Sequence, residues 1–340
     1  MVTSNKQLIA SSALLGLLII ATLELTGAQT GVCYGRLGNV PSPATAVSIC
    51  NQNNIRRMRI YDPNREVLQA LGGSNIGVIL GVPNTDLQNV AANQANANNW
   101  VQNNVRNYPN VRFRYIAVGN EVSPITGTSQ YKDFVLPAMR NIFNAISSAG
   151  LGNQIKVSTA IETGLVVNGY PPSAGTFSPQ VQSFINPIVQ FLASNGAPLL
   201  VNVYPYFAYI NNPGSISLDY ALFNSGVTTP DGPYSSLFDA LVDATYSALE
   251  KAGGSSVQIV VSESGWPSAG GQATTVDNAR TYNNNLIRHV NGNSGTPKRP
   301  GRSIETYIFD FFDEDQKSPE YEKHFGVFLA NGQKKYPINF

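Results

Sequence analysis

The sequence predicts an α/β fold, a (β/α)8 TIM barrel with a small loop-rich excursion around its last strands. Short apolar runs alternate with helix-like runs along the chain, which is typical of a parallel sheet. The apolar runs number eight, the number of strands that closes a barrel. Each run is apolar at consecutive positions, as expected of strands buried on both faces. The predicted strands span residues 31–35, 56–61, 76–82, 113–120, 155–160, 199–204, 258–264 and 304–312.

Each predicted strand is short and rich in β-branched or aromatic residues, a composition that favours strands. In chain order the eight segments read GVCYG, RRMRIY, IGVILGV, FRYIAVGN, IKVSTA, LLVNVY, QIVVSES and IETYIFDFF. The segments between them are expected to carry the helices of the barrel.

Two of these helices have clear apolar faces. Residues 134–150 predict a helix that ends at Gly150, and residues 236–254 predict one that ends before Gly253. Apolar residues recur in both at the three- and four-residue spacing of one helix face. The face residues are Val135, Met139, Ile142 and Ile146 in the first helix, and Phe238, Leu241, Val242, Thr245 and Leu249 in the second.

Residues 29–340 are predicted to form a single catalytic domain. They contain no linker, low-complexity tract or internal repeat. The segments 170–179 and 211–217 are rich in Pro, Gly, Ser and Asn and follow the fifth and sixth strands. We interpret them as loops over one face of the barrel.

Residues 1–28 are interpreted as a secretory signal peptide. A lysine precedes an apolar run over residues 8–23, and small residues at 26–28 supply a cleavage site. Small and polar residues interrupt the run, and no stop-transfer charges follow it. A membrane span is therefore not expected here or elsewhere.

Charged side chains are sparse. They make up 13% of the chain, about half the usual share, and the net charge is +1. Such a chain has no electrostatic basis for binding nucleic acid or an anionic membrane. Its surface must be polar through amide and hydroxyl groups, which suits a neutral, hydroxyl-rich partner. We expect a monomer.

The two cysteines are Cys33 and Cys50. A protein of this length can fold on its core alone, so a disulfide is not required. Two buried thiols are expected. A disulfide between the first strand and the helix that follows it stays open as the alternative.

Missing motifs exclude several chemistries. The chain has two histidines and no HExxH or CxxC motif, so we expect no metal site. It has no GxSxG elbow and no Walker GxxxxGK[ST] motif, which excludes the usual catalytic triad of hydrolases and a nucleotide-binding P-loop. No cofactor is expected.

Carboxylates remain as candidate catalytic groups. In a (β/α)8 barrel the site lies at the carboxyl ends of the strands. Glu121 follows the fourth strand in AVGNEVSP, and Glu263 ends the seventh in VVSESGWP. These strands lie on opposite sides of the ring, so the two carboxyls face each other. Glycoside cleavage needs one protonated and one ionised carboxyl group. The alternative for either residue is a solvated strand end, which is where an isolated Glu is found more often.

Other polar and aromatic residues are predicted at the same edge. Sugar rings stack on aromatic faces, and Asn120 could hydrogen-bond a sugar 2-hydroxyl. For any single aromatic residue, core packing is an equal alternative. The aromatic residues at or past strand ends are Tyr34, Tyr61, Tyr204, Tyr206, Phe207 and Trp266, and the acids after the eighth strand are Asp310, Asp313, Glu314 and Asp315.

These residues lie in motifs that resemble the plant endo-β-1,3-glucanases of glycoside hydrolase family 17, the pathogenesis-related glucanases. VGNEV and VVSESGWPS carry the resemblance most specifically, and GVCYG, MRIYDPN, PLLVNVYPYF, GTPKRPG and the closing YPINF extend it over the chain after the signal. The resemblance implies a (β/α)8 barrel and a retaining endo-hydrolase of β-1,3-glucan. It also implies callose or fungal-wall glucan as the substrate and a role in plant defence.

The resemblance further implies roles for single residues. By matching position, Glu263 is the expected nucleophile and Glu121 the expected acid/base. Tyr204 would orient the nucleophile, and Asn120 would bind the 2-hydroxyl. The other expected substrate-binding residues are Glu314 and Lys317 after the eighth strand and Tyr61, Phe207 and Trp266 along the groove.

Three segments depart from the family's patterns. They are GRLGNVPSP after the first strand, Cys50 at a usually aromatic position, and VVNGYPPS after the fifth strand. The changes affect a glycone-side subsite, the packing of the first helix and acceptor-side contacts. Neither catalytic position is altered.

Two alternative functions share this sequence pattern. One is a mixed-linkage β-1,3-1,4-glucanase, although Asp62 in MRIYDPN is typical of the 1,3-specific branch. The other is a catalytically silent glucan-binding wall protein. The chain ends at YPINF without the extension of vacuolar relatives, so we expect secretion to the cell wall space.

Overall fold

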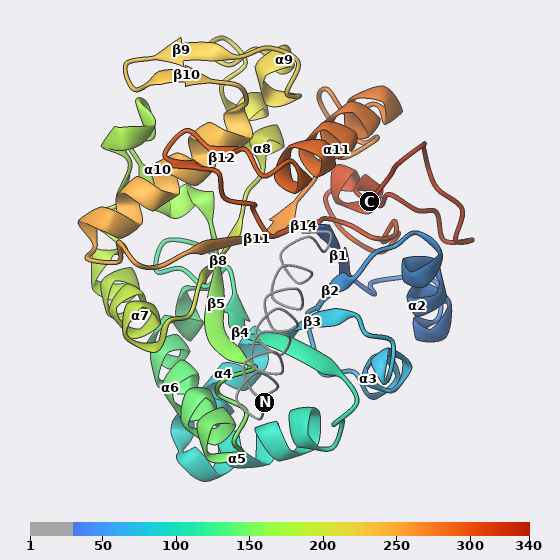
Figure 1. The fold of residues 1–340 in the computed structure, drawn as a ribbon, viewed down its shortest axis with the longest axis vertical. Coiled ribbons are helices and arrows are strands. Elements are labelled where there is room, and N and C mark those ends of the chain that lie inside the picture. The colour runs from blue at the N-terminus through green and yellow to red at the C-terminus, as the bar shows by residue number, and fades with distance from the viewer. Residues whose placement is uncertain (1–29) are drawn as a thin grey trace, which may run out of the picture.

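The barrel is the central feature of the structure. The computed structural model describes residues 30–340, so the predicted signal peptide lies outside the described residues. Within them, eight parallel strands close in the order β1-β14-β11-β8-β5-β4-β3-β2 (Figure 1). The predicted fold class is confirmed. The barrel strands are β1 (Thr30–Tyr34), β2 (Arg57–Ile60), β3 (Gly77–Val82), β4 (Arg112–Asn120), β5 (Lys156–Glu162), β8 (Leu199–Asn202), β11 (Ile259–Ser264) and β14 (Thr306–Ile308).

Helices surround the ring of strands (Figure 1). The two helices predicted from their apolar faces are α6 and α10, and both end within three residues of the predicted glycines. The helices are α2 (Pro43–Gln52), α3 (Arg65–Leu71), α4 (Leu87–Ala92), α5 (Gln94–Val101), α6 (Lys132–Ser148), α7 (Gln182–Asn195), α8 (Pro205–Asn211), α9 (Leu218–Ala221), α10 (Leu237–Lys251) and α11 (Val276–Asn291). Shorter helical turns are η1 (Asn84–Asp86), η2 (Gln102–Arg106), η3 (Ser129–Tyr131), η4 (Thr163–Leu165), η5 (Pro172–Ala174) and η6 (Glu320–His324).

Local sequence explains where these elements begin and end. Ser42 caps α2 by accepting a bond from the Thr45 amide, and Pro43 occupies the first turn. Ser236 caps α10 in the same way. Strands β3 and β11 are buried at every position, which explains their continuous apolar runs.

Three small hairpins lie outside the barrel, in the segments that follow β5, β8 and β11. Each strand in them has two or three residues, too few to leave an apolar pattern, and the sequence did not predict them. One hairpin uses the residues of the predicted 170–179 loop, and the segment after β14 is the loop-rich excursion. The hairpins are β6 (Val166–Val167) with β7 (Thr176–Phe177), β9 (Val227–Thr229) with β10 (Gly232–Tyr234), and β12 (Gly295–Thr296) with β13 (Arg299–Pro300).

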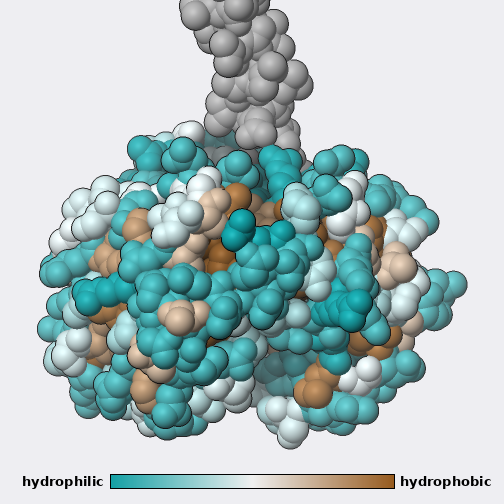
Figure 2. Space-filling view, turned by 90° about the horizontal axis from the view of Figure 1, so that it is seen from below, coloured by the Kyte–Doolittle hydropathy of each residue, from teal (hydrophilic) through white to brown (hydrophobic). Residues whose placement is uncertain are grey.

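The core and surface agree with the composition. Cys33 and Cys50 are buried free thiols, as predicted, and burial raises the pKa of both. Hydrophilic residues predominate on the face shown in Figure 2, where apolar residues are scattered. Among the described residues, no helix is long and apolar enough to cross a membrane.

Candidate active site

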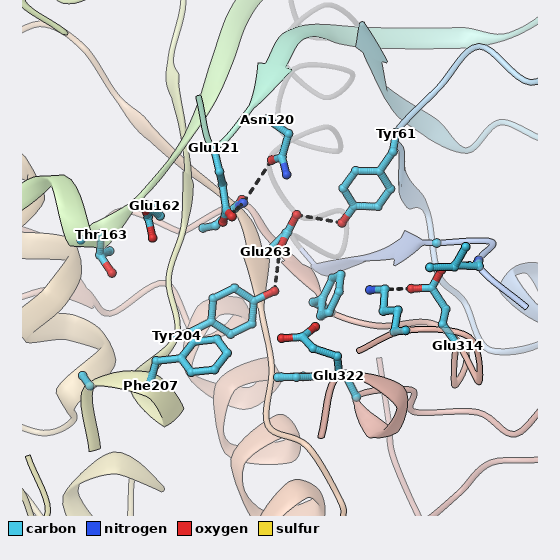
Figure 3. A pocket seen from close by; sticks show the side chains of 18 of the residues that line it. Tyr61, Asn120, Glu121, Glu162, Thr163, Tyr204, Phe207, Glu263, Glu314 and Glu322 are labelled. Carbon is cyan, nitrogen blue, oxygen red and sulfur yellow. Dashed lines mark hydrogen bonds and ion pairs between the residues drawn. The ribbon is translucent and has the colours of Figure 1, made fainter. Parts of the chain in front are cut away.

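Glu121 and Glu263 line one cleft at the carboxyl ends of the barrel strands (Figure 3). The cleft has a volume of about 1000 Å³, at the upper end of the range of small-molecule sites. The structure therefore brings together the two predicted carboxyls, although β4 and β11 are separated by only β5 and β8 and do not lie on directly opposite sides of the ring. The other predicted site residues that line this cleft are Tyr61, Asn120, Tyr204, Phe207, Glu314 and Lys317.

An irregularity in β11 directs Glu263 into the cleft. Val261 pairs with Val201 of β8, but the next paired residue is Glu263, opposite Asn202. The register shifts at the same place against β14. Such bulges re-aim a side chain beside active sites. Gly265 follows Ser264 at the end of β11, and a side chain does not fit there, because a Cβ would overlap the carbonyl of Phe309.

The end of β4 is also irregular, and it presents Glu121. Glu121 has a φ of 49°, a left-handed conformation that non-glycine residues rarely adopt. The Glu121 amide donates to the carbonyl of Ala160 at 2.9 Å, and the Glu121 carbonyl accepts a bond from the Thr128 hydroxyl at 2.8 Å. The Asn84 side chain bonds both the amide and the carbonyl of Asn120. Hydrogen bonds with β5, η1 and the following loop thus hold the strained backbone at this residue.

Glu263 is 5% exposed and is held by three side chains. Arg59 Nη1 and the Tyr61 hydroxyl donate to Oε1 at 2.9 and 2.8 Å. The Tyr204 hydroxyl donates to Oε2 at 2.6 Å (Figure 3). Tyr61, predicted only to line the groove, therefore contacts the carboxylate directly. The arrangement fixes the orientation of a buried, charge-balanced carboxylate.

Arg59 and Asn202 are functional residues that the sequence interpretation missed. Arg59 is 2% exposed and also donates from Nη2 to Asn120 Oδ1 at 2.7 Å and from Nη1 to Asn202 Oδ1 at 2.9 Å. Asn202 Nδ2 donates to Glu121 Oε1 at 2.8 Å. The two side chains thus link both carboxyls. The signal was present in RRMRIY and LLVNVY, where a polar residue interrupts a buried strand and must find partners.

Asn120 has one side-chain atom engaged within this network. Its Oδ1 accepts bonds from Arg59 and Asn202. The Nδ2 group is therefore the part of the amide that can donate to a sugar hydroxyl in the cleft.

Glu121 has an environment different from that of Glu263. Burial, followed by the negative charge of Glu263, raises the pKa of Glu121 to about 7, although the bond from Asn202 acts in the opposite direction. Glu162 at the end of β5 also lines the cleft and raises this pKa further. A carboxyl that stays protonated near neutral pH can act as a general acid.

We expect kcat/KM to decrease as the pH rises through about 7, because Glu121 then loses its proton. In Glu162→Gln the negative charge that raises the pKa of Glu121 is absent, so the alkaline limb should shift to lower pH. The measurement is kcat/KM against pH for both proteins. Asp133→Asn, at an exposed acid on α6, is the control and should not move the limb. An unchanged limb in Glu162→Gln would contradict this assignment.

Aromatic rings form a packed wall beside Glu263. The ring of Tyr204 packs against Phe207, Phe309 and Phe325, with centroids 5.4 to 5.9 Å apart. Phe207 lies at the cleft surface, where a sugar ring can stack on it (Figure 3).

Trp266 does not lie on the cleft wall, and its predicted groove-lining position is corrected. The side chain is fully buried, and its Nε1 donates to the carbonyl of Ala273 at 2.9 Å. Its ring packs between Tyr206 and Tyr282, with centroids 5.2 and 5.5 Å away. Just after the end of β11 the indole enters the core, where its large apolar area is removed from water.

The segment after β14 supplies a charged wall of the cleft. Glu314 and Lys317 form an ion pair with Oε2 and Nζ 2.6 Å apart. Glu322, which the sequence interpretation did not select, lines the same wall. Arg36, in the loop after β1 that contacts Glu314, donates to both carboxylate oxygens of Asp62 at 2.8 Å and so joins the loops after β1 and β2. Within residues 30–340, no cluster of three or more His, Cys, Asp or Glu side chains could hold a metal ion.

Comparison with known proteins identifies the family. A model of glycosyl hydrolases family 17 matches residues 30–340. The chain belongs to glycosyl hydrolases family 17. Among the relatives of this family 17 chain, a glucan endo-1,3-beta-glucosidase of Vitis vinifera is 58% identical, over 96% of this chain and 96% of its own length. A basic vacuolar isoform of glucan endo-1,3-beta-glucosidase, GLB of Nicotiana tabacum, is 54% identical over 99% and 92% of the two chains.

A solved structure has the same fold as this family 17 chain. It is CJP38, a beta-1,3-glucanase and allergen of Cryptomeria japonica pollen. The TM-score is 0.89 at 50% identity, with 92% of this chain and 98% of that chain covered. The resemblance predicted from the motifs is confirmed at the level of the family.

Proposed function

We propose that this family 17 chain is an endo-hydrolase of (1→3)-β-D-glucosidic bonds that acts by a retaining double displacement. The observation that carries the proposal is the unequal pair of carboxyls in one cleft. Glu263 is fixed by Arg59, Tyr61 and Tyr204, whereas burial and the charge of Glu263 keep Glu121 protonated to about pH 7. Carboxyls whose environments differ in this way can divide the acid and nucleophile roles.

In the first step a Glu263 oxygen attacks the anomeric carbon while Glu121 gives its proton to the leaving glycosidic oxygen. The bond between that carbon and oxygen breaks, and a glycosyl ester with Glu263 forms. In the second step Glu121, now ionised, takes a proton from water, and the water oxygen displaces Glu263. Both oxygens of Glu263 already accept hydrogen bonds, which suits a positioned nucleophile better than a base that must hold a water.

The remaining cleft residues are proposed to bind the glucan. Asn120 Nδ2 would donate to the 2-hydroxyl of the reacting sugar, and Phe207 would stack on a neighbouring ring. Glu314 and Lys317 would bind sugar hydroxyls. The cleft extends from the loop after β1 to the end of α8, a length that supports internal cleavage of a polymer.

We also propose a destination and role for the enzyme. The apolar run near the N-terminus supports entry into the secretory pathway, with the cell wall space as the destination and callose or fungal-wall glucan as the substrate. A role in defence against fungi is consistent with that substrate. The vacuole is the alternative destination, because a tobacco relative is named as a vacuolar isoform.

Hydrolysis of laminarin and lichenin, followed by proton NMR, tests the proposal. Laminarin should be cleaved at least about tenfold faster than lichenin, a discrimination of about 1.4 kcal/mol that a cleft shaped for 1,3-linked rings can provide. The first product from laminarin should carry the β-anomer at its new reducing end, as retention requires.

Other outcomes would change the assignment in specific ways. Faster cleavage of lichenin would indicate the mixed-linkage enzyme. An α-anomer as the first product would refute the nucleophile role of Glu263. Binding of laminarin without any reducing-sugar release would indicate a silent glucan-binding protein.

A further inference from the structure

Asp310 is a buried acid that the proposed reaction does not use. It follows β14, is 2% exposed, and lies beside the loop after β1, where the Gly35 amide donates to its Oδ1 at 3.4 Å. Its neighbour Glu314 is 3% exposed and reaches the cleft wall. Both carboxyl groups lie against Gly35, whose amide donates to Asp310 and where a Cβ would overlap the Glu314 carboxylate. A buried pair of this kind is stable only if its charges and hydrogen bonds are satisfied.

The hydrogen-bond donors around the pair satisfy only one oxygen of each carboxyl group. The Phe311 amide donates to Asp310 Oδ1, and the Leu37 amide donates to Glu314 Oε1, each at 2.6 Å. Asp310 Oδ2 has no hydrogen-bond donor among residues 30–340. Glu314 Oε2 has none there either, apart from its ion pair with Lys317. Two ionised carboxylates are acceptors only. A hydrogen bond from one carboxyl group to the other would supply the missing donor, and it requires one proton on the pair.

The charges around Asp310 lead to the same count. Burial raises the pKa values of the thiol and the two phenols that face it, so these three groups stay neutral. Lys335 is already paired with Asp313. One proton on the carboxyl pair leaves the pair with a single negative charge beside Lys317, whose ammonium also lies near Glu322. The titratable groups facing Asp310 are Cys33, Tyr34, Tyr61, Glu314, Lys317 and Lys335.

The surroundings place the proton on Asp310. Burial, followed by the charge of Glu314, raises the pKa of Asp310 well above its ordinary value. Burial also acts on Glu314, but the bond from Asp310 and the charge of Lys317 outweigh it and lower the pKa of Glu314. Glu314 is thus the ionised member, with the ammonium beside it.

We propose that Asp310 is a positioning residue that keeps its proton, donates a hydrogen bond to Glu314, and so holds the ionised Glu314–Lys317 pair at the sugar-binding wall. The Glu314 carboxylate is closely packed against the loop after β1, because a Cβ at Gly35 would overlap it. Lys317 Nζ lies 4.3 Å from the ring centroid of Phe309, which packs against the same wall. The inference rests on the proposed function in one respect, the binding of sugar by Glu314 and Lys317.

Infrared difference spectroscopy of the unliganded protein detects the proton without an activity assay. The wild-type minus Asp310→Asn spectrum at pH 8 should contain the carbonyl stretch of a protonated carboxylic acid. Asp243→Asn is the matched control, because Asp243 is a buried acid with a pKa raised mainly by burial to about 6 and should give no such band at pH 8. A wild-type minus Asp310→Asn spectrum without the band overturns the proposal.

Kinetics of two variants test the positioning role. Asn at 310 retains an N–H donor, so Asp310→Asn should keep KM for laminari-oligosaccharides within about twofold of the wild type. Asp310→Leu has no donor and should raise KM by about tenfold or more, with a smaller change in kcat. Equal KM values for the two variants contradict the role. If Asp310→Leu does not fold, the KM of Asp310→Asn and the infrared band still test whether Asp310 keeps its proton and donates to Glu314. Failure of the wild type to cleave glucan would refute the proposed function but leave the infrared result unaffected.

Discussion

Glu263→Gln is expected to lower kcat on laminarin by at least about 10⁴-fold, because the amide cannot form the glycosyl ester. Binding of laminari-oligosaccharides should change by less than about threefold, because Gln keeps the shape of the side chain and an acceptor for Arg59 and Tyr61. The measurements are reducing-sugar release and calorimetric binding on the same preparation. Equal activity of variant and wild type would remove Glu263 from the mechanism.

Glu305→Gln is the matched control for that substitution. Glu305 is also a poorly exposed glutamate, 11% exposed, which ion-pairs with Arg57 and Arg114 and precedes β14 at the opposite end of the barrel. Its change removes the same charge from a similar ionic cluster. Loss of activity in Glu263→Gln but not in Glu305→Gln would separate a chemical role from damage to the fold.

Glu263→Ala with azide and an aryl β-laminarioside tests the role more directly. In the cavity left by the carboxylate, azide can attack the anomeric carbon from the side that Glu263 occupied. It should therefore restore turnover and give the α-glycosyl azide. A β-glycosyl azide would assign Glu263 to the acid/base role instead.

Glu121→Ala is expected to reduce laminarin hydrolysis by about 10²–10⁴-fold, the range for loss of a general acid. An aryl glycoside with a good leaving group needs no proton, so formation of its glycosyl ester should be affected much less. Breakdown of the ester then becomes limiting, and azide should accelerate it and give the β-glycosyl azide. The measurement is pre-steady-state release of the aryl group together with NMR of the product.

The acid/base assignment has its own control. Asn202 donates to Glu121 Oε1 but cannot transfer the catalytic proton. Asn202→Ala should therefore lower activity without making it responsive to azide. Equal losses on laminarin and the aryl glycoside in Glu121→Ala would contradict the general-acid role.

Much of the fold could be predicted from local patterns because a parallel barrel buries its strands on both faces. The continuous apolar run in β3 and the capping Ser236 of α10 are examples of signals that act over a few residues. The barrel topology then placed Glu121 and Glu263 at one edge. The small hairpins left no such signal, because two or three residues per strand depend on the surface beneath them.

Other features required contacts between distant parts of the chain. Trp266 and Phe207 both follow strand ends, yet only the packing of Trp266 between Tyr206 and Tyr282 takes it into the core. The link between the carboxyls through Arg59 and Asn202 joins residues separated by 143 positions. Asp310 and Glu314 lie close in sequence, but the loop after β1 creates their burial.

The sequence by itself determined the barrel, the family and the choice of Glu121 and Glu263 as candidate catalytic residues, because these depend on periodicity and on short motifs. Only the tertiary structure decided the environment of each carboxyl. Protonation depends on burial and on charges brought from other strands, as at Glu121, where Glu263 and Glu162 both raise the pKa. For the same reason only the fold separated the aromatic rings of the cleft from those of the core, since burial is a property of the assembled barrel.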